Sequence, residues 1–245
     1  MKEPSIRTQD SIRIGITLGG WPFPEPDPQY LWDYADRMEK LNLDSIWFSD
    51  RIVSTYHSLE TVVAMSFIAA RTKRLKFGTS VIALPLRNPT VLAKEIATLD
   101  YLSGGRVLPA VGLGSEDSRE YQACGSFKHQ RAQRTDEIVE IMRLLWSRNN
   151  VTYQGKYFTL TGISIEPKPI QPGLPPIWFG GRSEAALRRT ARLGDGWLVS
   201  QAPPEEVKAG IRKIKAMASE FGNPIEDDHY GVLLAFCLAD SAQEA

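Results

Sequence analysis

The sequence predicts an α/β protein built as a (β/α)8 barrel, and three observations carry this prediction. Short apolar runs alternate with amphipathic helical patterns along the chain, as in parallel strands joined by crossover helices. The loop after the first strand, GGWPFPEPDP, lacks the Gly-x-Gly-x-x-Gly fingerprint of the open dinucleotide-binding sheet. The length of 245 residues also suits one barrel. We therefore expect a single domain over residues 1–245.

Seven apolar segments have the length and the flanking glycines or polar residues that are typical of strands. The first segment, IRIGITL, alternates between the two faces and ends at a pair of glycines. The third and fourth segments carry internal glycines, which indicate a bulge or a close backbone approach. The predicted strands cover residues 12–18, 45–50, 75–84, 106–114, 177–179, 196–200 and 230–239.

Six segments place apolar residues three and four positions apart, as amphipathic helices do. Pro89 falls in the first turn of the third helix, where its missing N–H does no harm. Gly194 follows the fifth helix and is a typical C-terminal cap. The predicted helices cover residues 28–42, 58–72, 88–103, 130–147, 183–193 and 203–221.

Residues 148–176 interrupt this alternation as an insertion after the fourth strand. Residues 151–162 have strand-forming residues on both sides of Gln154-Gly155, which predicts a hairpin. Five prolines in residues 163–176 predict an irregular segment. Seven strands fall one short of a complete barrel, so we expect the final strand and helix to be lacking. The strand that begins at Tyr230 should then have an exposed or partner-covered edge.

Composition excludes several classes of function. Lys+Arg and Asp+Glu both number 29, so the formal net charge is 29 − 29 = 0, which argues against binding of nucleic acid through phosphates. No apolar stretch is long enough to cross a membrane, and no apolar leader precedes the first strand, so we expect a cytoplasmic protein. Cys124 and Cys237 are far apart and are expected to be reduced thiols. The three histidines show no metal-ligand spacing, so no metal site is predicted.

The segment FGGRSE, residues 179–184, is the most informative local feature. Gly180 and Gly181 separate a predicted strand from a helix N-terminus, and Arg182 and Ser183 follow. Free N–H groups at a helix start attract anions, so this is a candidate phosphate site. A tight turn capped by Ser183 explains the same residues equally well.

Other candidates lie at the barrel mouth, which is the carboxyl end of the parallel strands where barrel enzymes place their chemistry. Gly112 and Gly114 end the fourth strand and would allow a flat ligand to approach the backbone. Glu116 could act there as an acid or base, although an exposed loop residue is the favoured interpretation. Asp50 and Arg51 end the second strand, where they could orient a ligand or form a structural ion pair.

Several segments together resemble the luciferase-like monooxygenase superfamily, and their order and spacing match as well. The resemblance is greatest to the branch that depends on the deazaflavin coenzyme F420. It implies a (β/α)8 barrel, a dimer, and binding of F420 or FMN at the barrel mouth. The segments that carry it include IWFSDRIV, LKFGTSVIALPLRNPTVLAKEIATLDYLSGGRV, AVGLGSEDSREYQACG, VTYQGKYF and PKPIQPGLPPIWFGGRSEAALRRTARLGDGW.

The resemblance also implies roles for individual residues. The Gly-Thr-Ser-Val strand of that branch carries a cis peptide under the deazaflavin ring, which here corresponds to Ser80–Val81. Glycines of the fourth-strand loop lie under the cofactor tail, and the glycines before the fifth predicted helix hold its phosphate. The implied cofactor-binding residues are Asp50, Thr79, Ser80, Val81, Gly112, Gly114, Ser115, Gly180, Gly181, Arg182, Ser183 and Ser200.

Two positions depart from the sugar-phosphate dehydrogenases of this branch. Arg51 stands where they have a histidine, and Ser115 stands where they have a catalytic glutamate, with Glu116 one place later. These differences argue against a sugar-phosphate substrate and make Arg51 and Glu116 the candidate catalytic residues. Arg51 would suit an anionic group of a substrate.

The implied function is hydride transfer between F420 and a small organic substrate. One alternative is an FMN-dependent monooxygenase that uses reduced FMN and O2. Another is a non-catalytic flavin-binding protein on a reduced barrel. The expected partners are a small-molecule substrate, a second copy of the chain in a homodimer, and a reductase that supplies reduced cofactor.

Overall fold

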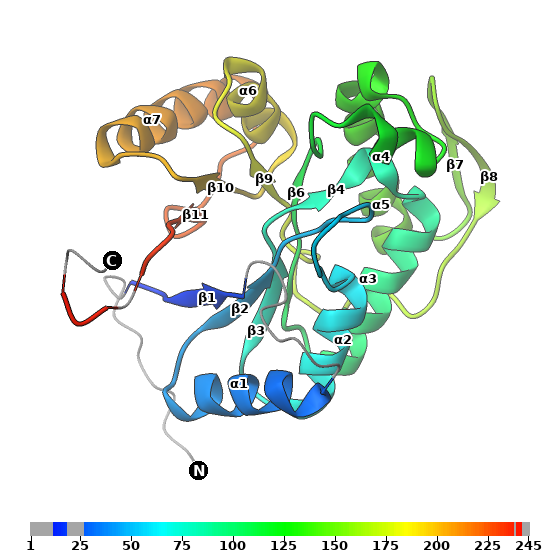
Figure 1. The fold of residues 1–245 in the computed structure, drawn as a ribbon. Coiled ribbons are helices and arrows are strands. Elements are labelled where there is room, and N and C mark those ends of the chain that lie inside the picture. The colour runs from blue at the N-terminus through cyan, green and yellow to red at the C-terminus, as the bar shows by residue number, and fades with distance from the viewer. Residues whose placement is uncertain (1–11, 19–26, 238, 242–245) are drawn as a thin grey trace, which may run out of the picture.

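The structure is a computed structural model that describes residues 12–18, 27–237 and 239–241. Helices and strands alternate along the chain as the sequence predicts (Figure 1). The strands are β1 (Gly15–Thr17), β2 (Ser45–Phe48), β3 (Lys76–Thr79), β4 (Ile82–Ala83), β5 (Val107–Leu108), β6 (Ala110–Gly112), β7 (Val151–Gln154), β8 (Thr159–Ile163), β9 (Trp178–Gly180), β10 (Gly196–Ser200) and β11 (Tyr230–Leu233). The α-helices are α1 (Pro28–Lys40), α2 (Thr61–Arg71), α3 (Pro89–Ser103), α4 (Ser118–Ala123), α5 (Arg131–Ser147), α6 (Glu184–Leu193) and α7 (Pro204–Phe221).

The parallel strands form two ladders, in the orders β1-β2-β3-β5 and β11-β10-β9-β6-β4. β3 and β4 come from one predicted strand, which breaks at Ser80 and Val81. β5 and β6 come from another, which breaks at Pro109, a residue without an N–H to donate. Because β3 pairs with β5 and β4 pairs with β6, the two ladders continue one another around the barrel. All seven predicted strands are therefore present in barrel order.

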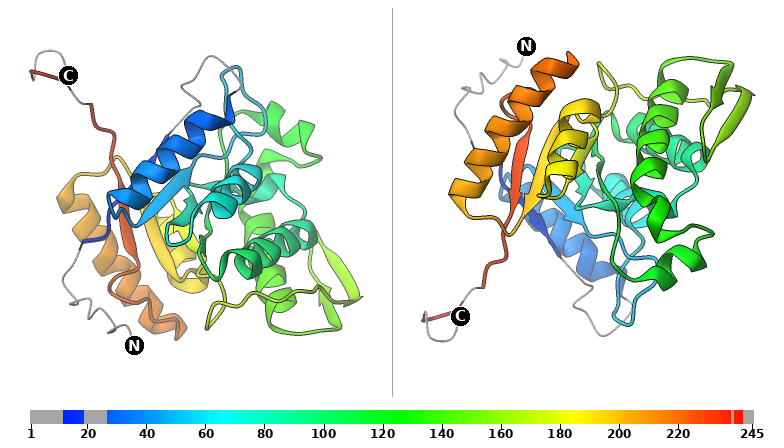
Figure 2. Two further views of the ribbon diagram at one scale, coloured as in Figure 1. Left: turned by 90° about the horizontal axis from the view of Figure 1, so that it is seen from below. Right: turned by 90° about the horizontal axis from the view of Figure 1, so that it is seen from above.

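The wall is open between its first and last strands. β1 pairs with β2 and β11 pairs with β10, and in the described part of the chain no ladder joins β1 to β11. The two strands nevertheless lie on the same side of the molecule (Figure 2). Arg13, just before β1, donates hydrogen bonds of 2.7 Å to the carbonyl and the carboxylate of Asp228, just before β11. Among the described residues β11 pairs with β10 alone, so one edge of the strand that begins at Tyr230 is unpaired, as predicted.

Two element predictions are wrong. The last strand ends at Leu233 rather than at residue 239, because the neighbouring strand ends at Ser200 and its ladder stops with the bond from the Gln201 N–H to the Leu233 carbonyl. Leu234 and Phe236 are exposed beyond it. The short helix α4 was also not predicted. Asp117 caps it by accepting a hydrogen bond from the Arg119 N–H. The hairpin is confirmed as the antiparallel pair β7 and β8.

Two tryptophans fill the amino-terminal part of the barrel interior. The rings of Trp47 and Trp178 lie 6.3 Å apart and are held by residues of β2 and β9. A side chain at Gly78 would meet the Trp47 ring at 2.7 Å, so β3 comes close enough to pack only because this position is glycine. The indoles thus occupy the volume that small residues on the facing strands leave open.

The helices pack around this wall, with α1, α2 and α3 on one side and α6 and α7 on another (Figures 1 and 2). Helix α3 begins where the Asn88 carboxamide accepts hydrogen bonds from Thr90 and Val91, and it ends at the left-handed Gly104. Among the described helices, none combines the length and the apolar composition that a membrane crossing requires. The loop GGWPFPEPDP covers residues 19–28, and its first eight residues, 19–26, lie outside the described residues.

Candidate functional site

The Val81 side chain lies next to two of the sequence-predicted glycines. A Cβ atom on Gly112 would lie 2.6 Å from Val81 Cγ2, and one on Gly180 would lie 3.2 Å from Val81 Cγ1. The preceding Ser80–Val81 peptide is cis, which confirms the expectation from the resemblance. The side chain of Val81, which immediately precedes β4, therefore packs against β6 and β9. At Gly112 a side chain would displace Val81, whereas at Gly180 the contact is tight and a small shift of Val81 would be needed.

Ser80 supplies an unpaired polar group at the same place. Its Oγ atom is buried, and no group in the described part of the chain forms a hydrogen bond with it. An unpaired buried hydroxyl costs free energy unless a ligand or water meets it. Thr79, by contrast, is satisfied, because its hydroxyl donates to the Ala110 carbonyl at 2.6 Å and accepts from the Ala110 N–H at 3.0 Å. Ser80 thus retains an unused hydroxyl, whereas Thr79 ties β3 to β6.

The loop after β6 has a fixed shape. Gly114 has φ of +84°, and Tyr121, which is fully buried, donates from its hydroxyl to the carbonyls of Leu113 at 2.6 Å and Ser115 at 2.9 Å. A Cβ on Gly114 would lie 2.9 Å from that hydroxyl. These contacts hold the backbone of residues 112–115 beside the barrel mouth. The sequence predicted the glycines but not the buried tyrosine that orders them.

Asp50 is fully buried and is used within the fold. Its Oδ1 accepts a 2.6 Å hydrogen bond from Arg87, and its Oδ2 accepts a 3.0 Å bond from the Ala83 N–H in β4. Burial raises the pKa of the Asp50 carboxyl, while the Arg87 guanidinium and the Ala83 N–H oppose that rise. Arg87 also pairs with Glu60 at 2.9 Å. Asp50 therefore positions β4 and Val81 through the backbone, and its direct contact with a cofactor stays a prediction.

Arg51, the next residue, is 38% exposed and is oriented by two partners. Its Nε donates to the Tyr56 hydroxyl at 3.2 Å, and its Nη1 lies 3.6 Å from Glu120 Oε2. The hydrogen bond with Tyr56 raises the pKa of Arg51, and the charges of Glu120 and Asp117 act in the same direction. The guanidinium is thus a fixed positive charge at the mouth.

Glu120 is a buried carboxylate that the sequence did not single out. Its Oε1 accepts hydrogen bonds from the N–H groups of Ile52 and Val53 at 3.1 and 3.4 Å, and its Oε2 accepts from Ser115 Oγ at 2.8 Å. One side chain therefore joins the loop after β2 to the loop after β6. No spacing rule identifies it, because its donors lie 68 and 67 residues away.

Glu116 lies in a different environment from the other candidates. Its side chain is 75% exposed and pairs with Lys128 at 2.6 Å and with Arg131 at 2.7 Å. Hydrogen bonds from these two side chains lower the pKa of the Glu116 carboxyl. A carboxylate with a lowered pKa is a poor proton donor at neutral pH. Its catalytic role stays a prediction, and the surroundings of the residue do not favour it.

The residues of the predicted phosphate site lie together at the start of α6. Ser183 accepts a hydrogen bond from the Ala186 N–H and caps the helix, so the capped-turn interpretation holds. Gly181 has φ of +104°, which favours glycine, and its carbonyl accepts a 2.9 Å bond from Trp197 Nε1 in β10. Arg182 reaches the Gln201 carbonyl at 3.4 Å, next to the exposed Ser200. The capped turn and a phosphate site are compatible, because the first N–H groups of the helix remain free for an anion.

Comparison with proteins of known sequence shows the family to which the chain belongs. A sequence profile of the family described as luciferase-like monooxygenase matches residues 10–245. The chain is 34% identical over 189 residues to the F420-dependent glucose-6-phosphate dehydrogenase of Amycolatopsis mediterranei, a match that covers 74% of this chain. The match covers 56% of that relative, so the chain spans little more than half its length.

Solved structures show the same fold. The monooxygenase RslO1 of Streptomyces bottropensis has a TM-score of 0.83 at 23% identity and covers 96% of this chain and 74% of its own. An F420-dependent secondary alcohol dehydrogenase in complex with an F420-acetone adduct has a TM-score of 0.77 at 27% identity. The match covers 91% of this chain and 68% of the dehydrogenase. The oxygenating constituent of 3,6-diketocamphane monooxygenase of Pseudomonas putida, in complex with FMN, has a TM-score of 0.79 at 17% identity. The match covers 91% of this chain and 66% of that protein.

Proposed function

We propose that this chain, which belongs to the luciferase-like monooxygenase family, is an oxidoreductase that transfers hydride between coenzyme F420 and a small organic substrate. The observation that carries the proposal is the meeting of Val81 with Gly112 and Gly180 beside the unpaired hydroxyl of Ser80. Similarity to an F420-dependent relative and to the F420-dependent alcohol dehydrogenase supports the choice of cofactor.

The residues present fit a flavin-like group. Ser80 and Val81 would support the ring, and the unpaired Ser80 hydroxyl would gain a partner. Gly112, Gly114 and Ser115 would lie along the chain that follows the ring. The N–H groups at the start of α6, with Gly180, Gly181, Arg182, Ser183 and Ser200, would hold a phosphate. When bound, a deazaflavin supplies the carbon that gives or accepts hydride, while the protein binds, orients and excludes water.

In this proposal Arg51 binds the substrate. Its guanidinium keeps its charge at any working pH, so it would orient an anionic or carbonyl oxygen and would not transfer a proton. Glu120 holds Arg51 and both loops in place. Glu116, with Lys128 and Arg131, would fix the outer part of the loop after β6.

An FMN-dependent monooxygenase is the second candidate, favoured by the FMN-bound structural neighbour. A non-catalytic flavin-binding protein is the third. We also propose a homodimer and a reductase that supplies reduced cofactor, as the resemblance implies. Light scattering after size-exclusion chromatography tests the dimer, and a single-chain mass would contradict it.

Titration with F420 and with FMN decides between the candidates. We expect F420 to bind at least 10-fold more tightly, measured by quenching of protein fluorescence. Arg182→Gln should weaken F420 binding several-fold, whereas Arg188→Gln, an exposed arginine within α6, should not. Tighter binding of FMN would overturn the choice of F420. Binding without any reduction or oxidation of the cofactor across a panel of alcohols, aldehydes and ketones would favour the non-catalytic candidate.

A further inference from the structure

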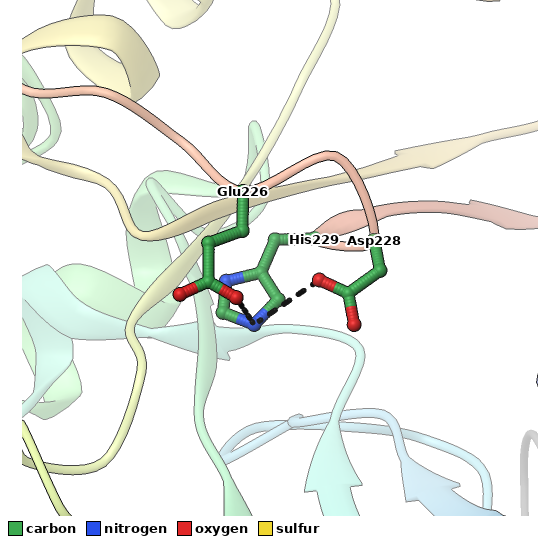
Figure 3. Close-up of side chains that lie close together, drawn as sticks. All are labelled: Glu226, Asp228 and His229. Carbon is green, nitrogen blue, oxygen red and sulfur yellow. Dashed lines mark ion pairs between the residues drawn. The ribbon is translucent and has the colours of Figure 1, made fainter. Parts of the chain in front are cut away.

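Three side chains that can bind a metal meet in the loop between α7 and β11, away from the barrel mouth. Glu226 Oε2 lies 4.0 Å from His229 Nε2, and Asp228 Oδ1 lies 3.9 Å from the same nitrogen (Figure 3). The three donor atoms all lie within 4.8 Å of one another. These residues, the 226–229 cluster, take no part in the proposed function.

A contact from outside the cluster fixes the imidazole of His229. Its Nδ1 lies 2.7 Å from the backbone carbonyl of Asp195, just before β10. Since a carbonyl oxygen can only accept, Nδ1 carries the hydrogen and the neutral ring has its lone pair at Nε2. The ring also packs on Trp178, with ring centres 5.5 Å apart. This arrangement is the one by which proteins orient metal-binding histidines, with the non-ligating nitrogen held by a carbonyl or carboxylate.

The Nε2 lone pair therefore points toward two carboxylates. In the described part of the chain no group donates a hydrogen bond to Nε2. Asp228 Oδ2 is taken by Arg13, which leaves Oδ1 facing the histidine. Three acceptors that face one another repel unless Nε2 is protonated or a cation lies between them. A bound divalent ion would satisfy all three and would leave the Arg13 bond in place.

We propose that the 226–229 cluster binds one zinc-type divalent ion through His229 Nε2, Glu226 Oε2 and Asp228 Oδ1, with water as the fourth ligand. Tetrahedral bonds of about 2.0–2.2 Å place neighbouring ligand atoms about 3.3–3.6 Å apart. The two carboxylate distances to Nε2, 3.9 and 4.0 Å, exceed this by a few tenths of an ångström, and the two carboxylate oxygens lie within 4.8 Å of one another. The side chains of Glu226 and Asp228 are 78% and 60% exposed, so they are free to move by that amount. An imidazole with two carboxylates suits zinc better than magnesium or calcium, which prefer more oxygen ligands.

The position of the cluster predicts what the ion does. His229 immediately precedes β11, and its carbonyl accepts a 3.0 Å bond from the Trp197 N–H in β10. The cluster thus lies at the amino ends of the last two strands, the end of a barrel that serves stability rather than chemistry. Arg13 connects it to β1 across the open side of the wall. Zinc should therefore stabilise this side of the barrel and leave cofactor binding unchanged.

Calorimetric titration of the tag-free protein with zinc chloride tests the proposal. The background variant Cys237→Ser removes an exposed thiol that could bind zinc. We expect one ion per chain, at least 10-fold weaker binding in Glu226→Gln and at least 100-fold weaker binding in His229→Gln. Glu226→Gln changes an exposed side chain, so it tests the site without unfolding the protein. Glu220→Gln, at an exposed position near the end of α7, is the matched control and should bind as the parent does.

The thermal midpoint gives a second measurement. Zinc should raise it in the parent and in Glu220→Gln, and should raise it less in Glu226→Gln. Unchanged zinc affinity in both Glu226→Gln and His229→Gln would overturn the proposal, and so would the absence of 1:1 binding in the parent. The outcome is independent of the proposed oxidoreductase activity, because zinc alone is the probe.

Discussion

The side chain of Val81 occupies the space that a side chain on Gly112 would need, since a Cβ there would lie 2.6 Å from Val81 Cγ2. Val81 belongs to the third strand predicted from the sequence and Gly112 belongs to the fourth. Their contact sets the floor of the proposed cofactor site, and it depends on a glycine that cannot be enlarged. The first prediction follows from this contact.

Gly112→Ala should displace Val81 and weaken F420 binding at least 10-fold, because the added methyl group and the valine cannot occupy the same volume. Gly180→Ala meets Val81 at 3.2 Å and should have a smaller effect. Fluorescence titration measures both affinities. Val81→Ala in the Gly112→Ala background removes the clash and should restore part of the binding. Equal affinity in Gly112→Ala and the parent would show that Val81 does not support the cofactor.

Arg87→Met should destabilise the fold by about 3 kcal/mol, because it leaves Asp50 buried without its counter-ion. Urea unfolding measures the loss, and Asp50→Asn in the same background should recover part of it. Arg119→Gln breaks an exposed pair with Asp117 and should change stability by less than about 1 kcal/mol. If Arg87→Met loses no more stability than this control, Arg87 does not stabilise the buried Asp50 carboxylate.

The stability lost in Arg87→Met should depend on pH. Burial raises the pKa of Asp50, and removal of Arg87 should raise it further. For an acid whose pKa is higher in the folded state, stability is greatest below the unfolded value and falls as the pH rises through the folded value. The deficit of Arg87→Met should therefore shrink as the pH is lowered toward about 4. Urea midpoints measured from neutral pH down to that value check this, and a constant deficit would exclude Asp50 as its source.

Glu120→Ala should release the loops after β2 and β6, because the N–H groups of Ile52 and Val53 would lose their acceptor. We expect a loss of about 2–3 kcal/mol and faster hydrogen exchange at these two amides. Glu116→Gln, in the loop just before α4, is the matched control, and it should leave the exchange of Ile52 and Val53 unchanged because Glu116 is exposed. If the Ile52 and Val53 amides exchange as slowly in Glu120→Ala as in the parent, other contacts hold the two loops.

Glu39 should make stability fall with acid. Burial alone would raise the pKa of its carboxyl, but hydrogen bonds from the N–H groups of Leu75, Arg74 and Lys73 lower it below 4.5. An acid with a lowered pKa contributes stability above its unfolded value, and that contribution is lost as the pH falls through the folded value. Glu39→Gln should thus be less stable than the parent at neutral pH and should approach it below about pH 4. A difference that persists undiminished at low pH would refute this.

Much of the fold could be predicted from the sequence. The alternation of apolar runs and helical patterns gives the order of all seven barrel strands, and Gln154-Gly155 marks the turn region of the hairpin between β7 and β8. The extent of the last strand could not be predicted, because residues 234–237 are as apolar as those before them. Only the length of the neighbouring strand β10 ends the ladder at Leu233.

The candidate site also contains residues that the sequence predicts and residues that only the structure reveals. The glycines at 112, 114, 180 and 181 are visible in the sequence, because glycine at the end of a predicted strand is a local signal of a tight turn or a close backbone approach. Glu120 is invisible, since its importance comes from N–H groups nearly 70 residues away. The residues of the 226–229 cluster are close in the chain, but only the structure shows that the Asp195 carbonyl orients His229 toward the two carboxylates.

The barrel class, the order of its strands and the glycines of its mouth can be predicted from the chain alone, because hydrophobic periodicity and glycine placement are local properties. The tertiary structure decided which charged residues serve the fold and which face a ligand. Asp50 and Arg51 are adjacent in the chain, yet one is buried against Arg87 and the other is exposed at the mouth. Burial and the choice of ion-pair partner depend on neighbours brought in from distant segments, and no local pattern encodes them.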